Sequence, residues 1–183
     1  SSIIAPAYKK ALLESDILLP DGIALQLFYW IAWKFKKIFT HKKRLENLNG
    51  TDFWLFFIDW LQSEKGKDNV ELYLYGTYPG ILEKTKTFLQ ERWFNIAYAQ
   101  DGFTNFDWEQ VKDIRKRNKK SYAILFVART TPEYPIQELR SWSNQEKIKE
   151  SKLLVCNQWW TFDFWAWVQK RAPKLWRTYK IEW

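Results

Sequence analysis

The chain has 183 residues, a formal net charge of +8 and a single cysteine, and 46% of its residues are hydrophobic. This length and composition are typical of one globular domain with a sizeable core. One cysteine excludes an internal disulfide framework, and no window reaches the roughly 18 uncharged apolar residues that a membrane-spanning helix needs. The positive charge favours anionic partners, namely nucleotides, nucleic acid or an acidic membrane surface.

The aromatic content is unusual, with 13 Trp beside only 6 Gly. Average usage of about 7% would give about 13 Gly in a chain of this length. An α/β protein needs glycine in its turns, so the deficit of Gly and the excess of Trp call for an explanation.

Short apolar runs alternate with longer amphipathic stretches along the whole chain. The runs predict buried strands that start near Asp16, Val70, Phe94, Tyr122 and Lys152. The amphipathic stretches predict helices at residues 23–39, 51–62, 79–93, 107–118 and 137–149. Thr51 or Asp52 is expected to cap the second helix, and Pro79 to occupy the first turn of the third.

This alternation predicts a single α/β domain over residues 1–183, Rossmann-like, with a mainly parallel sheet and helices on both faces. Ligands of such sheets bind beyond the carboxyl ends of the strands. Asp21 belongs to the segment Pro20-Asp21-Gly22, which follows the first apolar run. Gly76 and Gly80 belong to a turn that enters a helix N-terminus, which offers amide N–H groups to a phosphate. Three further loops, at residues 100–103, 135–138 and 161–164, follow the remaining runs.

Several common chemistries are not supported by the sequence. The glycine patterns of dinucleotide-binding and P-loop proteins are missing, and one Cys with one His cannot form a zinc cluster. Cys156 lies in an apolar run, which favours a buried small side chain over a nucleophile. The basic residues 115–117, with Lys119 and Lys120, end a predicted helix, where cations complement the helix dipole.

Together and in this order, the loops resemble the WecG/TagA/CpsF glycosyltransferases (glycosyltransferase family 26) over residues 12–183. The matching segments are Pro20-Asp21-Gly22-Ile23, Asn49-Gly50-Thr51-Asp52, Leu74-Tyr75-Gly76 followed by Pro79-Gly80, Asp101-Gly102-Phe103, Ile124-Leu125-Phe126-Val127, Pro135-Ile136-Gln137-Glu138, Phe162-Asp163-Phe164, Lys170-Arg171-Ala172-Pro173 and Ile181-Glu182-Trp183.

The resemblance implies an inverting transferase that needs no metal or other cofactor. Its donor would be UDP-N-acetylmannosamine or a related UDP-sugar, and its acceptor an undecaprenyl-diphosphate-linked sugar of wall or surface polymers. It would act in the cytoplasm, at the inner face of the cell membrane. The family's C-terminal tail, which would contact the membrane, and its upstream segment are not in this chain. Homo-oligomers are possible partners, and nucleic acid is not expected.

The resemblance also assigns roles to residues. Asp21 would be the general base that accepts the proton of the acceptor hydroxyl, a role suited to a carboxylate in a buried strand-end site. The residues expected to bind substrate are Thr51, Asp52, Gly76, Gly80, Gln137, Glu138, Phe162, Asp163 and Arg171. Arg171 would offset the charge of the diphosphate.

Four Trp residues stand where the family usually has Gly: Trp33, Trp159, Trp160 and Trp167. Trp fills space that Gly leaves open for a ligand or a tight turn, so these residues could impair activity. Two explanations remain open: UGA codons that mean Gly in the source organism, or a genuinely aromatic variant. A degenerate, non-catalytic family member and a basic, aromatic-rich nucleic-acid-binding module are the alternative functions, and the solvent exposure of the Trp side chains discriminates between them and the enzyme.

Overall fold

The computed structural model describes residues 50–65, 67–118, 120, 122–128, 150–157 and 161–168. Within these ranges it contains a parallel sheet of four strands in the order β2-β1-β3-β4. The strands are β1 (Val70–Gly76), β2 (Asn95–Gln100), β3 (Tyr122–Ala128) and β4 (Leu154–Asn157). Four of the five predicted strands are therefore confirmed, and the one near Asp16 lies outside the described residues.

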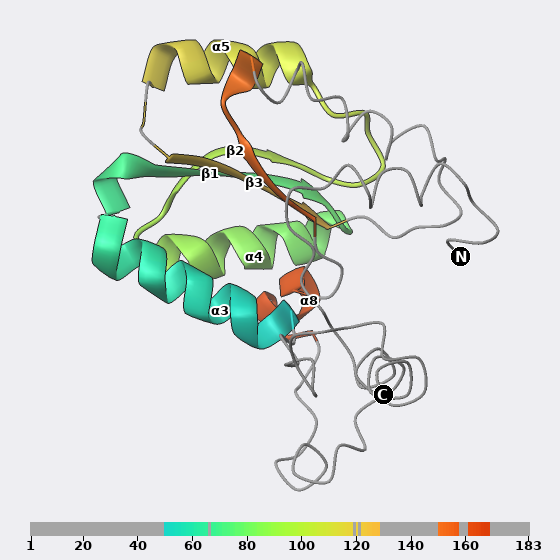
Figure 1. Cartoon of the computed structure of the whole chain (residues 1–183). Coiled ribbons are helices and arrows are strands. Elements are labelled where there is room, and N and C mark those ends of the chain that lie inside the picture. Colours follow the sequence, from blue (N-terminus) through green and yellow to red (C-terminus); the bar gives the residue numbers. More distant parts are fainter. Residues whose placement is uncertain are drawn as a thin grey trace, which may run out of the picture.

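Helices cover both faces of the sheet (Figure 1). The described helices are α3 (Gly50–Trp60), α4 (Pro79–Glu91), α5 (Trp108–Asn118) and the short α8 (Thr161–Trp165), with a π-helical turn at Leu61–Lys65 and a 3-10 turn at Lys67–Asn69. Helix α5 lies on one face, and α3, α4 and α8 lie on the other. The predicted α/β fold with a parallel sheet covered on both faces is confirmed for this part of the chain.

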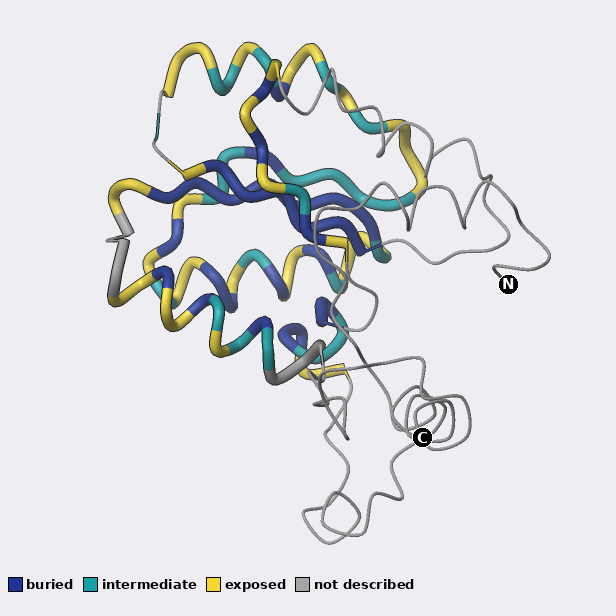
Figure 2. Tube along the Cα trace, in the orientation of Figure 1, coloured by how far each residue is buried: buried dark blue, intermediate teal, exposed yellow. Residues whose placement is uncertain are grey.

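The central strand β1 explains the two-sided core. All seven of its residues are buried, because a parallel strand in the middle of a covered sheet has no face in water. Leu72 and Leu74 point to the side of α3, α4 and α8, whereas Tyr73 and Tyr75 point to the side of α5. Figure 2 shows β1 and β3, in the middle of the sheet, as long runs of buried residues.

The strand order places a topological switch point next to β1. From β1 the chain passes through α4 to β2 at one edge of the sheet, and then returns through α5 to β3 on the other side of β1. Strands β1 and β3 run in step, from Val70 opposite Tyr122 to Gly76 opposite Ala128. In open parallel sheets the crevice for ligands opens where the connections diverge in this way.

Helix α3 packs against the core through side chains at helical spacing. Its buried side chains, Trp54 and Ile58, recur at helical spacing and continue to Leu61 in the following turn. The prediction that Thr51 or Asp52 caps this helix is wrong, because the preceding Gly50 is already helical.

Helix α4 agrees with its prediction at the N-terminus. Tyr78 precedes the helix in an extended conformation and Pro79 takes the first turn, where its missing N–H removes no hydrogen bond. The predicted helix at 107–118 also matches α5, whereas those at 23–39 and 137–149 lie outside the described residues.

Candidate functional site

The loop after β1 approaches the end of β3 closely enough to require glycine. Gly76 has φ +114°, and a Cβ built on it would lie 2.1 Å from the carbonyl oxygen of Ala128. The next residue forms a hydrogen bond at the same place: the N–H of Thr77 donates to the carbonyl oxygen of Ala128 over 2.9 Å. The carboxyl ends of β1 and β3 are thus joined at the switch point of the sheet.

The loop after β2 joins this arrangement through a second glycine. The N–H of Gly102 donates to the carbonyl of Thr77 over 2.9 Å, and a Cβ at Gly102 would lie 3.1 Å from the nitrogen of Thr77. The carboxylate of Asp101 accepts the N–H of Phe103 over 2.8 Å, which closes a local turn. The loops after β1 and β2 and the last residue of β3 therefore meet at one edge of the sheet.

Helix α4 directs its N-terminus to this edge. The amide groups of a first helical turn and the helix dipole together favour an anion. No atom of the described residues lies within 4 Å of the place where a Cβ of Gly80 would be, so none of them blocks a ligand from the backbone there. Gly76 and Gly80, both expected to bind substrate, thus lie at the two ends of one short loop.

An aromatic pair at this edge was not anticipated from the sequence. The side chains of Tyr78 and Phe103 are 65% and 69% exposed, and their ring centroids lie 5.2 Å apart. They follow β1 and β2 respectively, so each ring extends from one of the loops that meet at the site. The only signal in the sequence was that each residue follows a glycine of a strand-end loop by one or two positions.

Helix α8 brings two further expected residues to the face covered by α4. Phe162 is fully buried, and its carbonyl accepts the hydroxyl of Thr85 in α4 over 3.2 Å. This placement favours a structural role for Phe162, which anchors α8, over direct contact with a substrate. The neighbouring Asp163 is only partly buried, and desolvation raises the pKa of its carboxyl.

The remaining expected site residues are not located by the structure. Asp21, Gln137, Glu138 and Arg171 lie outside the described residues. Thr51 and Asp52 belong to the first turn of α3, which contacts α8, but their side chains are not among those described. The convergence of Asp21 and Gln137 with Gly76 and Asp163 therefore stays a prediction.

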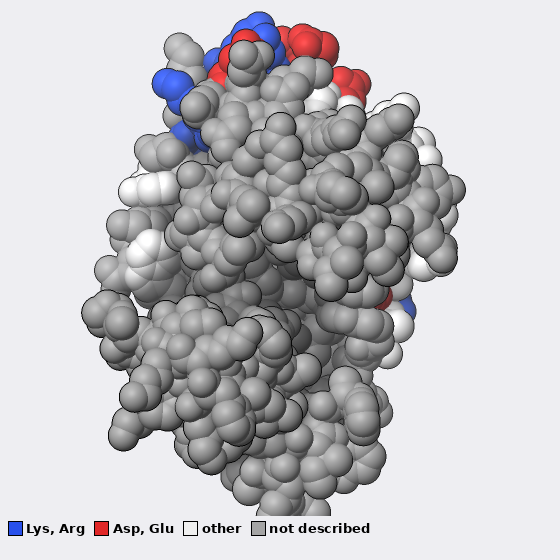
Figure 3. All heavy atoms as spheres, turned by 45° about the vertical axis from the view of Figure 1, so that its right-hand side comes forward, with Lys and Arg blue, Asp and Glu red and all other residues white. Residues whose placement is uncertain are grey.

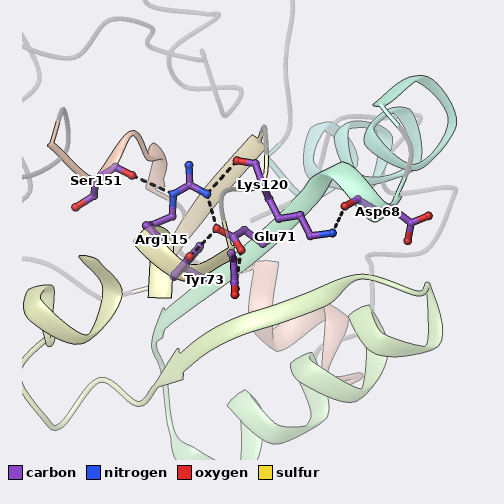
Figure 4. A network of polar contacts seen from close by, with 7 residues as sticks. Asp68, Glu71, Tyr73, Arg115, Lys120 and Ser151 are labelled. Atoms are coloured by element: carbon purple, nitrogen blue, oxygen red, sulfur yellow. Dashed lines mark hydrogen bonds and ion pairs between the residues drawn. The ribbon is translucent and has the colours of Figure 1, made fainter. Parts of the chain in front are cut away.

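The opposite, amino-terminal end of the sheet holds a buried charge network (Figure 4). The carboxylate of Glu71 is fully buried, and its Oε1 lies 2.5 Å from Nη1 of Arg115. It also accepts the hydroxyl of Tyr73 over 2.7 Å and the amide of Asn118 over 3.0 Å. The same Arg115 donates to the carbonyls of Ser151 and Lys120.

This network corrects part of the interpretation of the basic residues in α5. Arg115 does more than complement the helix dipole, since it neutralises a carboxylate on the central strand. Burial, with the hydrogen bond to Glu71, raises the pKa of the Tyr73 hydroxyl, which therefore stays protonated. Lys116 and Arg117 remain exposed, in agreement with the dipole interpretation.

Charges of both signs lie together over α5, seen at the top of Figure 3. Lys112 pairs with Glu150 at 3.1 Å and Lys116 with Asp113 at 3.4 Å. Cys156 is free and buried, as predicted, and burial raises the pKa of its thiol to about 12. Among the described residues, no helix is both long and apolar enough to cross a bilayer.

Comparison with protein families agrees with this geometry. Residues 3–183 match the model of the Glycosyl transferase WecG/TagA/CpsF family, which is nearly the whole chain. The match confirms the resemblance that the ordered loops indicate, and it favours a transferase over a nucleic-acid-binding module. The parallel sheet, with its glycine-dependent loops at the carboxyl edge, is therefore the scaffold of a sugar-transferring enzyme. The chain belongs to the WecG/TagA/CpsF family of glycosyltransferases, which takes part in cell-wall polysaccharide synthesis.

Proposed function

We propose that this protein is an inverting hexosyltransferase that moves an N-acetylmannosamine-type sugar from a UDP donor to an undecaprenyl-diphosphate-linked acceptor. The observation that carries the proposal is the loop from Gly76 to Gly80. It lies at the switch point of the sheet, excludes side chains where it touches β3, and leads into the N-terminus of a 13-residue helix. The family membership supplies the reaction class, and the loop supplies a place for the donor.

The diphosphate of the donor fits the start of α4. A diphosphate needs N–H donors and positive potential, and the start of α4 offers the N–H of Gly80 and the positive end of the helix dipole. The open space at Gly80 lets a phosphate oxygen approach the backbone without meeting a side chain of the residues that the structure describes. Arg171, expected nearby from the family pattern, would add a charged donor.

The exposed rings of Tyr78 and Phe103 suit the uracil end of the same donor. A planar base stacks on aromatic faces, and such stacking contributes roughly 1–3 kcal/mol per base. Both rings extend from loops that meet beside Gly76, so base and diphosphate would be bound by neighbouring segments. Gln137, Glu138 and Asp163 would then contact the sugar.

The reaction proposed for Asp21 is a direct displacement. The acceptor hydroxyl loses its proton to the Asp21 carboxylate while its oxygen forms the bond to the anomeric carbon. The bond from that carbon to the diphosphate breaks on the opposite side, and UDP leaves with the electron pair, so the configuration inverts. A lipid-linked acceptor places this step at the inner face of the membrane, where the net charge of +8 favours contact with anionic lipid.

The test measures donor binding and transfer together. Gly80→Glu adds a carboxylate in open space at the helix N-terminus, where acidic residues are tolerated by the fold. We expect it to weaken UDP binding at least tenfold in calorimetry, because the new charge competes with the diphosphate. Thr87→Glu adds the same charge on an exposed position of the same helix and is expected to leave binding unchanged.

A panel of UDP-sugars, offered with a lipid-diphosphate-linked acceptor, identifies the transferred sugar. We expect transfer from UDP-N-acetylmannosamine or a close relative. If Gly80→Glu binds UDP as tightly as the unchanged chain, the donor does not lie at α4. If no UDP-sugar is used by a chain with Gly at positions 33, 159, 160 and 167, the proposed reaction is wrong.

A further inference from the structure

Helix α4 ends in a hydrogen-bonded turn that has a tryptophan in its left-handed position. The N–H of Trp93 donates to the carbonyl of Gln90 over 2.8 Å, and that of Phe94 donates to the carbonyl of Leu89 over 3.1 Å. Trp93 has φ +65°. This pair of bonds is the Schellman motif, in which the residue at the left-handed position is usually glycine.

Helix α8 ends in the same way. The N–H of Trp167 donates to the carbonyl of Phe164 over 3.1 Å, and that of Val168 donates to the carbonyl of Asp163 over 2.9 Å. Trp167 has φ +57°, so it occupies the position that Trp93 occupies after α4. A residue with a Cβ is strained in this conformation, because the Cβ comes too close to the following carbonyl oxygen.

The indoles at these two positions are also unusually exposed. The exposed fraction is 70% for Trp93 and 76% for Trp167, whereas Trp54 is 8% and Trp165 is 0% exposed. Trp usually buries most of its large apolar surface, as Trp54 and Trp165 do in the core. Among the six described Trp, Trp54 and Trp165 are buried in the core, whereas Trp93 and Trp167 are largely exposed and have left-handed backbone.

Positive φ alone does not separate these residues from others, since Thr77 (φ 61°) and Lys152 (φ 52°) share it. What separates them is the combination of a helix-ending Schellman turn, a left-handed backbone and an exposed large apolar side chain. The turn and the left-handed backbone suit Gly, whereas the left-handed backbone and the exposure of a large apolar side chain are unfavourable for Trp.

We infer that positions 93 and 167 are glycine in the protein as its own cells make it, specified by UGA codons that the source organism reads as Gly. Trp54 and Trp165 are genuine tryptophans under the same inference. It moves the composition from 13 Trp and 6 Gly to 11 Trp and 8 Gly, toward the average use of Gly. Trp167 was already one of the four Trp at usual glycine positions, and the structure alone adds Trp93.

The inference bears on the site through the turn after α8. The carbonyl of Asp163 accepts the N–H of Val168 across this turn, so the turn fixes the helix that carries Asp163. Glycine at position 167 holds that turn without strain. The inference does not depend on the identity of the donor or acceptor, and its tests need neither.

The decisive experiment determines the codons of the gene and the peptide masses of the natural protein. In the gene we expect UGA at codons 93 and 167 and UGG at codons 54 and 165. In the protein purified from source cells we expect peptide masses that correspond to glycine at positions 93 and 167. UGG codons at 93 and 167, or peptides with Trp there, overturn the inference.

Stability provides an independent measurement on recombinant protein. Trp93→Gly and Trp167→Gly are each expected to raise Tm by about 2–4 °C above the matched Trp→Ala variants, which remove the indole but keep the Cβ. Trp165→Gly is expected to lower Tm strongly, since that side chain is fully buried. A Gly variant at 93 or 167 that melts below its Ala counterpart contradicts the conformational argument.

Discussion

Two glycines of one loop respond oppositely to the same substitution. In Gly76→Ala the new Cβ meets the carbonyl oxygen, carbon and nitrogen of Ala128 at 2.1, 2.5 and 3.1 Å. All three are backbone atoms of a buried strand, so no flexible side chain can move aside. In Gly80→Ala the new Cβ meets no atom of the described part of the chain within 4 Å, and Ala is the better helix former.

The loss of folding free energy expected for Gly76→Ala has two contributions. A non-glycine residue forced into a sparsely populated conformation such as φ +114° costs roughly 1–3 kcal/mol. Displacement of the end of β3 adds to this, as small-to-large changes in packed regions cost about 1–3 kcal/mol. A total of about 2–6 kcal/mol lowers Tm by roughly 4–24 °C in a chain of this size. Gly80→Ala should change Tm by at most about 4 °C, upward.

Thermal denaturation followed by circular dichroism, with and without UDP, measures both effects. We expect Gly76→Ala to lose stability and UDP binding together, because the loop no longer closes on β3. A Gly76→Ala protein that melts within about 1 °C of the unchanged chain would refute the contact between the two strand ends. Equal losses for both alanine variants would refute the distinction between a crowded and an open position.

Three further predictions concern single side chains. Asp21→Asn, made in a chain with Gly at 33, 159, 160 and 167, should keep UDP binding but lose about 10²–10⁴-fold in transfer rate; unchanged turnover removes Asp21 from the mechanism. Arg115→Met leaves the buried carboxylate of Glu71 without its cation and should cost about 3–5 kcal/mol in chemical denaturation, whereas the exposed Arg117→Met should cost less than about 0.5 kcal/mol. Asp163→Asn should raise Tm at pH 7: burial raises the folded pKa of this carboxyl, so wild-type stability falls as pH rises from the unfolded pKa through the folded one. The difference in Tm between the two proteins should vanish near pH 3, which is below the unfolded pKa, because the carboxyl is then protonated in both states. A difference in Tm that persists at this pH contradicts a role for the charge.

The sequence predicted the described strands and helices because their apolar runs and amphipathic stretches differ in length and period. It also located Gly76 and Gly80, since a glycine turn into a helix after a buried strand is a local pattern. The contact between Tyr78 and Phe103 was not predictable, because it depends on how two loops from different strands meet.

Two other features were missed for different reasons. Glu71 interrupts an apolar strand, which signals a buried charge, but its partner Arg115 is 44 residues away and only the fold brings the two together. Trp93 was placed inside the predicted helix at 79–93. Its side chain fits an amphipathic pattern, and only the backbone angle reveals that the helix has already ended.

The buried network around Glu71 stabilises the sheet at a distance from the loops that vary with the substrate. Stability of the fold and variability of the site, which often conflict in enzymes, therefore depend on different residues. The network joins β1, α5 and the segment before β4 at the amino end of the sheet, away from the strand-end loops. Those loops can therefore exchange residues, or be grafted from relatives that use other sugars, without disturbing the charge pair that fastens the strands. For engineering of donor specificity, the amino end is the part to leave intact and the carboxyl edge is the part to vary.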